Sequence, residues 1–274
     1  MNIFAIMLVK NEADVVKSVL ESATTWATKI FVLDNGSTDG TWEILQSLKG
    51  NVIVPWKQDF RPYSNGMRAD VFNHFRNESQ PGDWWCFKLD ADEFYVEDPR
   101  GFLPKIPLKY QIVAKKSIDY FLTETDVENY QFTGDFLTDK PHIIHIHKTC
   151  WAEQRFFRYR QNLVWNNDPN SHFPNRIGVL APQTILVRHY QFRSPQQMQK
   201  RLDLRNNLST KKEGLAFRHV TQTDWHELLA GENDVIVDDG NPNTYHALPT
   251  RNSLKQAWWK NLSMEIGVSL GFYH

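Results

Sequence analysis

The chain has 274 residues, with 31 Lys and Arg against 32 Asp and Glu, which gives a formal net charge of −1. This length suffices for one large domain, or one domain with an appendage, around a sizeable core. The balanced charge argues against a broad basic surface of the kind that binds nucleic acid. Aromatic residues make up 13% of the chain, which suits either stacking on sugars or a Trp-rich core.

The cysteines and the apolar segments indicate the cellular compartment of the protein. Cys86 and Cys150 have no metal-like spacing, and Cys86 lies in an apolar run that predicts a buried thiol in a reducing compartment. The apolar N-terminus has no basic region before it and ends at Lys10, unlike a signal peptide. No stretch approaches the length of a transmembrane helix. We therefore expect a cytoplasmic protein, with peripheral contact at the inner face of the membrane left open.

The first hundred residues alternate between strand and helix patterns. Apolar or β-rich runs predict buried strands at 3–9, 30–33 and 52–54. Capping residues and apolar residues at helical spacing predict helices between them, and a further helix follows the loop at 62–70. This order implies an α/β fold with a mostly parallel sheet and helices on both faces.

A fourth apolar run, 84–89, ends in the acidic residues Asp90, Asp92 and Glu93. In an extended strand Asp90 and Asp92 would project to the same side, and their oxygens would suit Mg2+ or Mn2+. An exposed acidic turn is the alternative.

The polar residues after Val9, Leu33 and Leu89 point to a shared site. In open α/β sheets, ligands bind outside the carboxyl ends of the strands, so these three strand ends are expected to meet at one cleft.

The second half of the chain has shorter strand-like runs, at 110–114, 143–147, 156–159 and 184–187. Ser194 then predicts a helix N-cap, and an aromatic helix-like piece surrounds Trp258 and Trp259. We expect a domain of residues 1–193 and a helical C-terminal extension of residues 194–274 packed on it. The basic segment 200–212 is expected to be a solvated helix face, with contact to an anionic acceptor or a membrane surface as the alternative.

Three ordered blocks resemble the inverting glycosyltransferase family 2, whose members have a GT-A fold: Leu8–Glu12, Phe31–Thr41 and Leu89–Glu93. The middle block is similar to the family's Asp-(Asp/Asn)-Gly-Ser-x-Asp-x-Thr signature, and the third is similar to its Asp-x-Asp motif. Residues 155–158 and 187–194 look like the subgroup that includes lipopolysaccharide-core sugar transferases.

The resemblance implies roles for particular residues. The implied donor-binding residues are Val9, Glu12, Asp34, Arg68, Asp90 and Ala91, and the implied metal ligands are Asp92 and His189. Asp168 and His172 lie in a polar, turn-rich loop suited to the acceptor side, so either is a candidate for the catalytic base, with an ordinary surface loop as the alternative. Phe173 stands where the subgroup has Glu, so the identity of the base stays open.

The implied activity is metal-dependent, inverting transfer of a sugar from a nucleotide-sugar, expected to be UDP-linked, to a glycan or lipid-linked glycan. Such a reaction would use Mn2+ or Mg2+ and belong to cell-envelope polysaccharide biosynthesis. A catalytically silent glycan- or nucleotide-binding module is the first alternative, motivated by Phe173. A nucleotidyltransferase is the second, although it would carry a Gly-rich, basic phosphate loop where this chain has Lys10-Asn11-Glu12.

Overall fold

The computed structural model describes residues 1–175, 177–210, 221–254 and 266. The predicted aromatic piece around Trp258 and Trp259 lies outside these residues, as do Lys211 and Lys212 of the basic segment.

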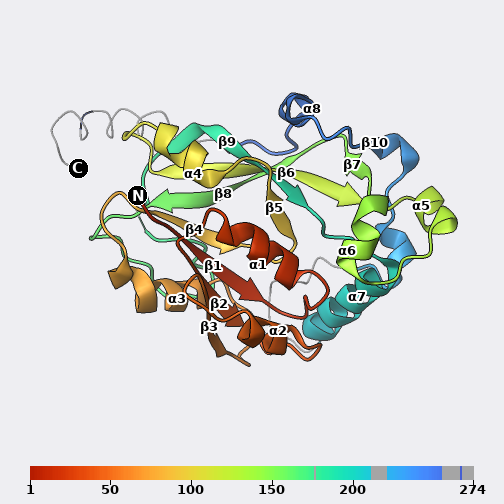
Figure 1. The fold of residues 1–274 in the computed structure, drawn as a ribbon, viewed down its shortest axis with the longest axis horizontal. Coiled ribbons are helices and arrows are strands. Elements are labelled where there is room, and N and C mark those ends of the chain that lie inside the picture. Colours follow the sequence, from red (N-terminus) through yellow and green to blue (C-terminus); the bar gives the residue numbers. More distant parts are fainter. Residues whose placement is uncertain (176, 211–220, 255–265, 267–274) are drawn as a thin grey trace.

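Four parallel strands form the first half of the sheet. They are β1 (Ile3–Val9), β2 (Lys29–Asp34), β3 (Ile53–Gln58) and β4 (Trp84–Leu89). Their order is β3-β2-β1-β4, so that β1 lies between β2 and β4. Since all four run in the same direction, their carboxyl ends lie along one edge of the sheet (Figure 1).

The later strands extend the sheet beyond β4. They are β5 (Glu93–Tyr95), β6 (Ile112–Phe121), β7 (His145–His147), β8 (Trp151–Arg158), β9 (Leu180–His189) and β10 (Val235–Val237). β8 pairs antiparallel with β4, and the path continues through β6 and β7 to β10. β9 lies off this path, parallel to β6 and antiparallel to the short β5.

Helices cover both faces of the sheet. They are α1 (Val16–Thr24), α2 (Thr41–Ser47), α3 (Met67–Phe75), α4 (Pro99–Phe102), α5 (Glu124–Asn129), α6 (Phe136–Asp139), α7 (Pro195–Thr210) and α8 (Pro242–Ala247). Alternate residues of β1 enter two hydrophobic clusters, one shared with α1 and the other with α3. Figure 1 shows α1 lying across the sheet and α7 beyond the carboxyl end of β1.

The predicted β-α-β-α-β order is confirmed, and the second half differs in length and pairing. β6 and β9 each have ten residues, where the apolar runs predicted about four or five. Ser194 caps α7 as predicted, since its Oγ accepts a hydrogen bond of 3.2 Å from the Gln197 amide. The segment after residue 193 is not purely helical, because it also contributes β10 to the sheet.

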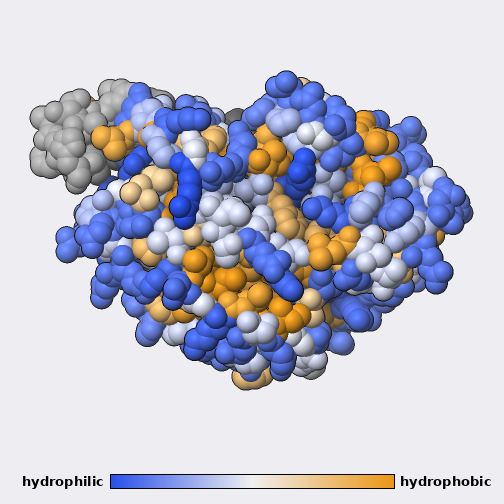
Figure 2. All heavy atoms as spheres, in the orientation of Figure 1, coloured by the Kyte–Doolittle hydropathy of each residue, from blue (hydrophilic) through white to orange (hydrophobic). Residues whose placement is uncertain are grey.

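Polar residues cover most of the face shown in Figure 2, and apolar residues form separate patches among them. Within the described ranges, every helix is too short or too polar to cross a bilayer. Cys86 and Cys150 are both buried and both unpaired, as the sequence predicts for Cys86.

Candidate active site

The loop after β1 is braced by the loop after β2. The amide of Asn11 donates to Ser37 Oγ at 2.9 Å, and Asn11 Oδ1 accepts from the Thr38 amide at 2.8 Å. Asn11 has a φ of 55°, a left-handed conformation that Asn tolerates better than most residues. The amide of Ala13 donates to Asp39 Oδ2 at 3.1 Å. Part of the block Phe31–Thr41 therefore has a structural role, because its side chains and backbone fix the loop that follows β1, here called the β1 loop.

Asp34 ends β2 and is fully buried. Its Oδ1 accepts hydrogen bonds from the Ser37 amide at 2.8 Å and from Gln58 Nε2 at 3.3 Å. Its Oδ2 has no hydrogen-bond partner among the described residues. A buried carboxylate oxygen without a partner is costly, which makes this atom a candidate acceptor for a ligand donor group.

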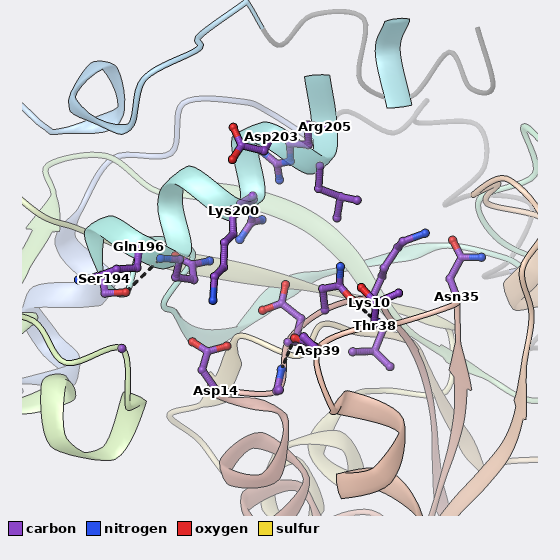
Figure 3. A pocket seen from close by; sticks show the side chains of 18 of the residues that line it. Lys10, Asp14, Asn35, Thr38, Asp39, Ser194, Gln196, Lys200, Asp203 and Arg205 are labelled. Carbon is purple, nitrogen blue, oxygen red and sulfur yellow. Dashed lines mark hydrogen bonds between the residues drawn. The ribbon is translucent and has the colours of Figure 1, made fainter. Parts of the chain in front are cut away.

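A cavity of about 650 Å³ opens between the β1 loop and α7. Val9 and Glu12 line it from the β1 side, as the resemblance implies for donor-binding residues, and Lys200, Arg201 and Arg205 line it from α7. Figure 3 shows Lys200 extending from α7 toward Asp14. Lys200 is exposed, as expected for a solvated basic face, whereas Arg201 is partly buried and pairs with Asp92, so the expectation is wrong for Arg201.

Asp90 and Asp92 do not lie on one side of a strand. β4 ends at Leu89 and the chain turns before β5, so the alternation that predicted a common direction does not apply. Asp90 Oδ2 lies 3.3 Å from Arg155 Nη1 and 3.5 Å from Lys88 Nζ. Burial raises the pKa of Asp90, but Lys88 and Arg155 outweigh this effect and hold it below its usual range.

Asp92 is surrounded by cations. Its Oδ1 lies 3.5 Å from His189 Nε2, and its Oδ2 lies 3.2 Å from Arg201 Nη1 and 3.8 Å from Arg193 Nη1. Burial alone would raise the pKa of Asp92, yet these neighbours, His189 first, hold it well below its usual range. The structure thus brings together Asp92 and His189, which lie almost a hundred residues apart in the chain.

The two ring nitrogens of His189 face different carboxylates. Nδ1 lies 2.9 Å from Asp119 Oδ1, while Nε2 faces Asp92. Burial lowers the pKa of His189, but Asp92 and Asp119 together raise it to about 9. The ring is therefore held in one orientation by Asp119.

The Asp92–His189 pair fits part of a metal shell. No group of three or more His, Cys, Asp or Glu side chains positioned to hold a metal ion occurs within the described ranges. One carboxylate oxygen and one imidazole nitrogen are suitable ligands for Mn2+, and Mg2+ usually keeps several waters and substrate phosphates in its shell. The residues present therefore fit a cation that takes its other ligands from a bound diphosphate and water.

Arg193 connects the β1 loop to this region. It is fully buried, and its guanidinium donates to Glu12 Oε2 at 2.5 Å and to Asp14 Oδ2 at 2.7 Å. Burial raises the pKa of Glu12, and Arg193 counteracts that effect only in part.

The positive charge of Arg68 helps to lower the pKa of Asp90, whereas its hydrogen bonds go to other residues. Its Nη1 donates to Tyr63 Oη at 3.1 Å and to Asn65 Oδ1 at 3.3 Å. The hydrogen bond to the Asp90 carboxylate is made by Arg155. Ala91 is buried in the turn between β4 and β5.

The loop with the two candidate bases packs against the segment before α3. Gly66 allows this packing, because a Cβ there would lie 2.5 Å from Asn167 O and 2.6 Å from Asp168 O. Trp165 anchors the loop in the core, and its carbonyl accepts a hydrogen bond of 2.7 Å from Asn73 Nδ2. The loop is therefore held to α3 at one end.

Asp168, His172 and Phe173 differ in their surroundings. Asp168 Oδ1 accepts a hydrogen bond of 2.7 Å from the Asn170 amide, which caps a turn. His172 Nε2 lies 3.5 Å from Asn65 Nδ2. Phe173 is 39% exposed and packs its ring against Phe87.

Sequence reasoning gave no role to Arg193, Arg201, Asp119 or Arg155. Arg155 and Arg193 lie in the segments 155–158 and 187–194, which resemble the lipopolysaccharide-core subgroup. The resemblance draws attention to these residues but does not indicate what they contact. The sequence gave no indication of a role for Arg201 or Asp119. Arg201 is a basic residue in a polar helix and Asp119 an acidic residue in an apolar strand, and either could pair with many residues.

Residues 4–105 match the family model described as Glycosyl transferase family 2. Two curated relatives are similar over 138 residues at 25% identity: the SPbeta prophage-derived glycosyltransferase SunS of Bacillus subtilis (strain 168) and the glycosyltransferase SunS of Bacillus phage SPbeta. The similar region covers 48% of this chain and 28% of each relative, so the chain spans well under half of their length.

Solved structures of S. aureus TarS are also similar to the chain. TarS 1-349 has a TM-score of 0.37 and 12% identity, covering 77% of this chain and 65% of that one. Its complex with UDP has a TM-score of 0.30 and 15% identity, covering 44% and 36%.

The family match and the names of the relatives support a glycosyltransferase. Together with the parallel β3-β2-β1-β4 unit, they agree with the predicted GT-A-type α/β fold. The likeness to the lipopolysaccharide-core subgroup remains a prediction.

Proposed function

We propose that the chain is a metal-dependent, inverting glycosyltransferase that moves a sugar from a UDP-linked donor to a glycan or lipid-linked glycan acceptor. The proposal rests mainly on one observation: Asp92 and His189 lie 3.5 Å apart beside the cavity between the β1 loop and α7. Arg201 joins the two places, since it lines the cavity and lies 3.2 Å from Asp92.

The donor would occupy the cavity with its nucleoside near the β1 and β2 ends. Val9 and Glu12 line this part of the cavity. Asp34 is buried next to it, and its unpartnered Oδ2 would accept an N–H or O–H of the nucleoside once the loop after β2 moves to expose it. The cationic side chains of α7, Lys200, Arg201 and Arg205, would face the diphosphate. Charged hydrogen bonds of this kind are about twice as strong as neutral ones.

Asp92 and His189 would hold the divalent cation. Such a cation, bound to the diphosphate, stabilises the negative charge that develops as the sugar is transferred. Arg201 contacts Asp92 Oδ2, whereas His189 faces Oδ1, so Arg201 would hold the Asp92 carboxylate in place beside His189. Asp90, held by Arg155, would contact the donor sugar or ribose.

The acceptor hydroxyl needs a group that removes its proton, and we assign this role to His172. Asp168 uses Oδ1 to cap the turn at Asn170, whereas the contact of His172 with Asn65 is long at 3.5 Å. His172→Ala should lower kcat by about 10²- to 10⁴-fold, the usual contribution of general-base catalysis. Asp168→Asn is the matched variant, because it can keep the hydrogen bond to the Asn170 amide but loses the carboxylate. If kcat falls further in Asp168→Asn than in His172→Ala, Asp168 is the catalytic base.

Thermal shift measurements test the donor site. We expect UDP with Mn2+ to raise the melting temperature by mass action, and EDTA to remove most of the increase. GDP, with a larger base, is the comparison nucleotide and Mg2+ the comparison metal. No shift with any nucleotide, in either metal, would contradict the donor-site assignment.

The alternative with a specific observation behind it is a binding module without catalytic activity. The subgroup's Glu is replaced by Phe173, and that ring is 39% exposed on the candidate acceptor side. UDP binding with neither transfer nor hydrolysis of UDP-sugars would favour this alternative.

A further inference from the structure

Asp119 lies beside the proposed metal ligand His189 on the neighbouring strand. β6 and β9 run parallel with Asp119 paired to His189 in register, so the two side chains are adjacent. Asp119 is only 5% exposed, and its Oδ1 lies 2.9 Å from His189 Nδ1. Ser117 Oγ donates to the same oxygen at 2.7 Å.

This contact determines which ring nitrogen faces Asp92. A carboxylate that accepts the Nδ1 proton fixes the plane of the ring and directs Nε2 toward Asp92; Nε2 can bind a metal ion after it releases its own proton, which metal binding promotes. In the structure Nε2 lies 3.5 Å from Asp92 Oδ1. Asp119 therefore orients His189 toward Asp92 without contacting the proposed cation position itself.

The second oxygen of Asp119 is held from a distant part of the chain. Arg251 Nη2 donates to Asp119 Oδ2 at 2.6 Å. The segment 249–252 is attached to the β8 region, because the Arg251 amide donates to Cys150 O at 2.8 Å. The side chain of Asn252 also bonds both backbone groups of Ala152, each at 2.8 Å.

We propose that Asp119 and Arg251 are positioning residues for metal binding: Asp119 holds His189 in the orientation that binds the cation, and Arg251 holds Asp119. The segment 249–252 is thereby coupled to the donor site through one chain of contacts, Arg251–Asp119–His189. This inference rests on the proposed function, since it needs Asp92 and His189 to bind a cation. Neither Asp119 nor Arg251 lies within the residues that match the family model.

The test is a titration of the intact chain with Mn2+, followed by the EPR signal of free Mn2+, alone and with UDP. Outer partners of metal-bound histidines contribute about 10- to 100-fold to metal affinity, so Asp119→Asn should weaken Mn2+ binding by about 10-fold or more. Arg251→Ala should cause a smaller loss, roughly 3-fold, because it acts one contact further away. Arg251→Lys, which keeps a positive charge near Asp119, should recover part of that loss.

The double variant Asp119→Asn/Arg251→Ala separates coupling from general destabilisation. If Arg251 acts through Asp119, its removal should add little once Asp119 is Asn, so that the two losses are not additive. Asn252→Ala removes two hydrogen bonds of the same segment and leaves Arg251 in place, and it should keep the affinity of the unmodified chain. Additive losses, or an equal loss in Asn252→Ala, would overturn the role of Arg251.

The outcomes distinguish this inference from the proposed function. If the unmodified chain binds Mn2+ and Asp92→Asn abolishes binding, but Asp119→Asn, folded by circular dichroism, binds normally, only the positioning role fails. If the unmodified chain binds no Mn2+ with or without UDP, the proposed metal site and this inference both fail. Arg251 is 39% exposed on its side chain, so its variants are expected to fold even if Asp119→Asn does not.

Discussion

Asp92→Asn should abolish metal-stimulated sugar transfer while leaving the fold intact. Replacing the carboxylate by an amide removes the negative charge that we expect to hold the cation. Loss of one group that stabilises charge in a transition state typically costs about 10²- to 10³-fold in kcat. The variant should also lose the Mn2+-dependent part of the thermal shift with UDP.

The fold should survive this change because the cations around Asp92 have other partners. Arg193 is bonded to Glu12 and Asp14, and His189 keeps Asp119. Arg201 retains the carbonyl of Gln191 at 3.0 Å. We therefore expect a cooperative unfolding transition with a melting temperature close to that of the unmodified chain.

Glu21→Gln is a suitable control for Asp92→Asn. Glu21 is a carboxylate on the exposed side of α1, with a weak contact of 3.9 Å to Lys17. The same carboxylate-to-amide change there should leave kcat and Mn2+ binding unchanged. Undiminished transfer by Asp92→Asn, measured as release of UDP in the presence of Mn2+, would refute the metal-ligand role.

The parallel part of the fold was predictable from the sequence because its signals are local. The apolar runs of β1, β2 and β4 and the apolar spacing in α1 and α2 specify each element by its nearest neighbours. The predicted side-chain caps are not seen, because the N-cap residues of α1 and α2, Val15 and Gly40, make no side-chain cap hydrogen bond. Parallel strands then bring their carboxyl ends to one edge. The predicted cleft is met only in part, because residues after β1 and β2 line the cavity and the residues after β4 do not.

The Asp90–Asp92 geometry was not predictable, because it depends on where β4 stops. If β4 continued through Asp92, both carboxylates would project to the same side of the strand. The apolar run 84–89 does not indicate that the chain turns before β5. The turn sends Asp90 to Arg155 and Asp92 to His189 and Arg201. The predicted common direction of the two carboxylates is therefore wrong, and their roles at the donor site stay predictions.

The cationic side of the site depends on tertiary packing. Arg201 and Arg205 belong to a polar helix whose sequence predicts exposure. They line the cavity because α7 lies beyond the carboxyl end of β1, with the cavity between α7 and the β1 loop. Asp119 meets His189 through the register of β6 and β9, which the sequence of either strand alone does not encode.

Arg193→Met should cause the largest loss of stability among single changes near the site. Arg193 is buried and holds Glu12, Asp14 and the carbonyl of Tyr190. Methionine has a comparable length but no charge, so it leaves two carboxylates without their main cation. Removal of one partner from a buried pair typically costs about 3–5 kcal/mol.

The expected loss lies at the lower end of that range, about 3 kcal/mol, because solvent reaches both carboxylates. The side chains of Glu12 and Asp14 are 19% and 20% exposed. Urea unfolding followed by tryptophan fluorescence would measure the difference in free energy of unfolding. Arg193→Lys should be intermediate, since one ammonium group cannot reproduce the paired contacts of a guanidinium.

A compensating variant identifies the cause. If unpaired carboxylates account for the loss, adding Glu12→Gln and Asp14→Asn to Arg193→Met should restore part of the stability, because the amides carry no charge. The triple variant should still bind UDP poorly, since Glu12 lines the cavity and Arg193 lies 3.8 Å from Asp92. A loss below about 1 kcal/mol in Arg193→Met would mean that Arg193 behaves like a surface ion pair. The β1 loop would then have to be held mainly by its hydrogen bonds to Ser37, Thr38 and Asp39.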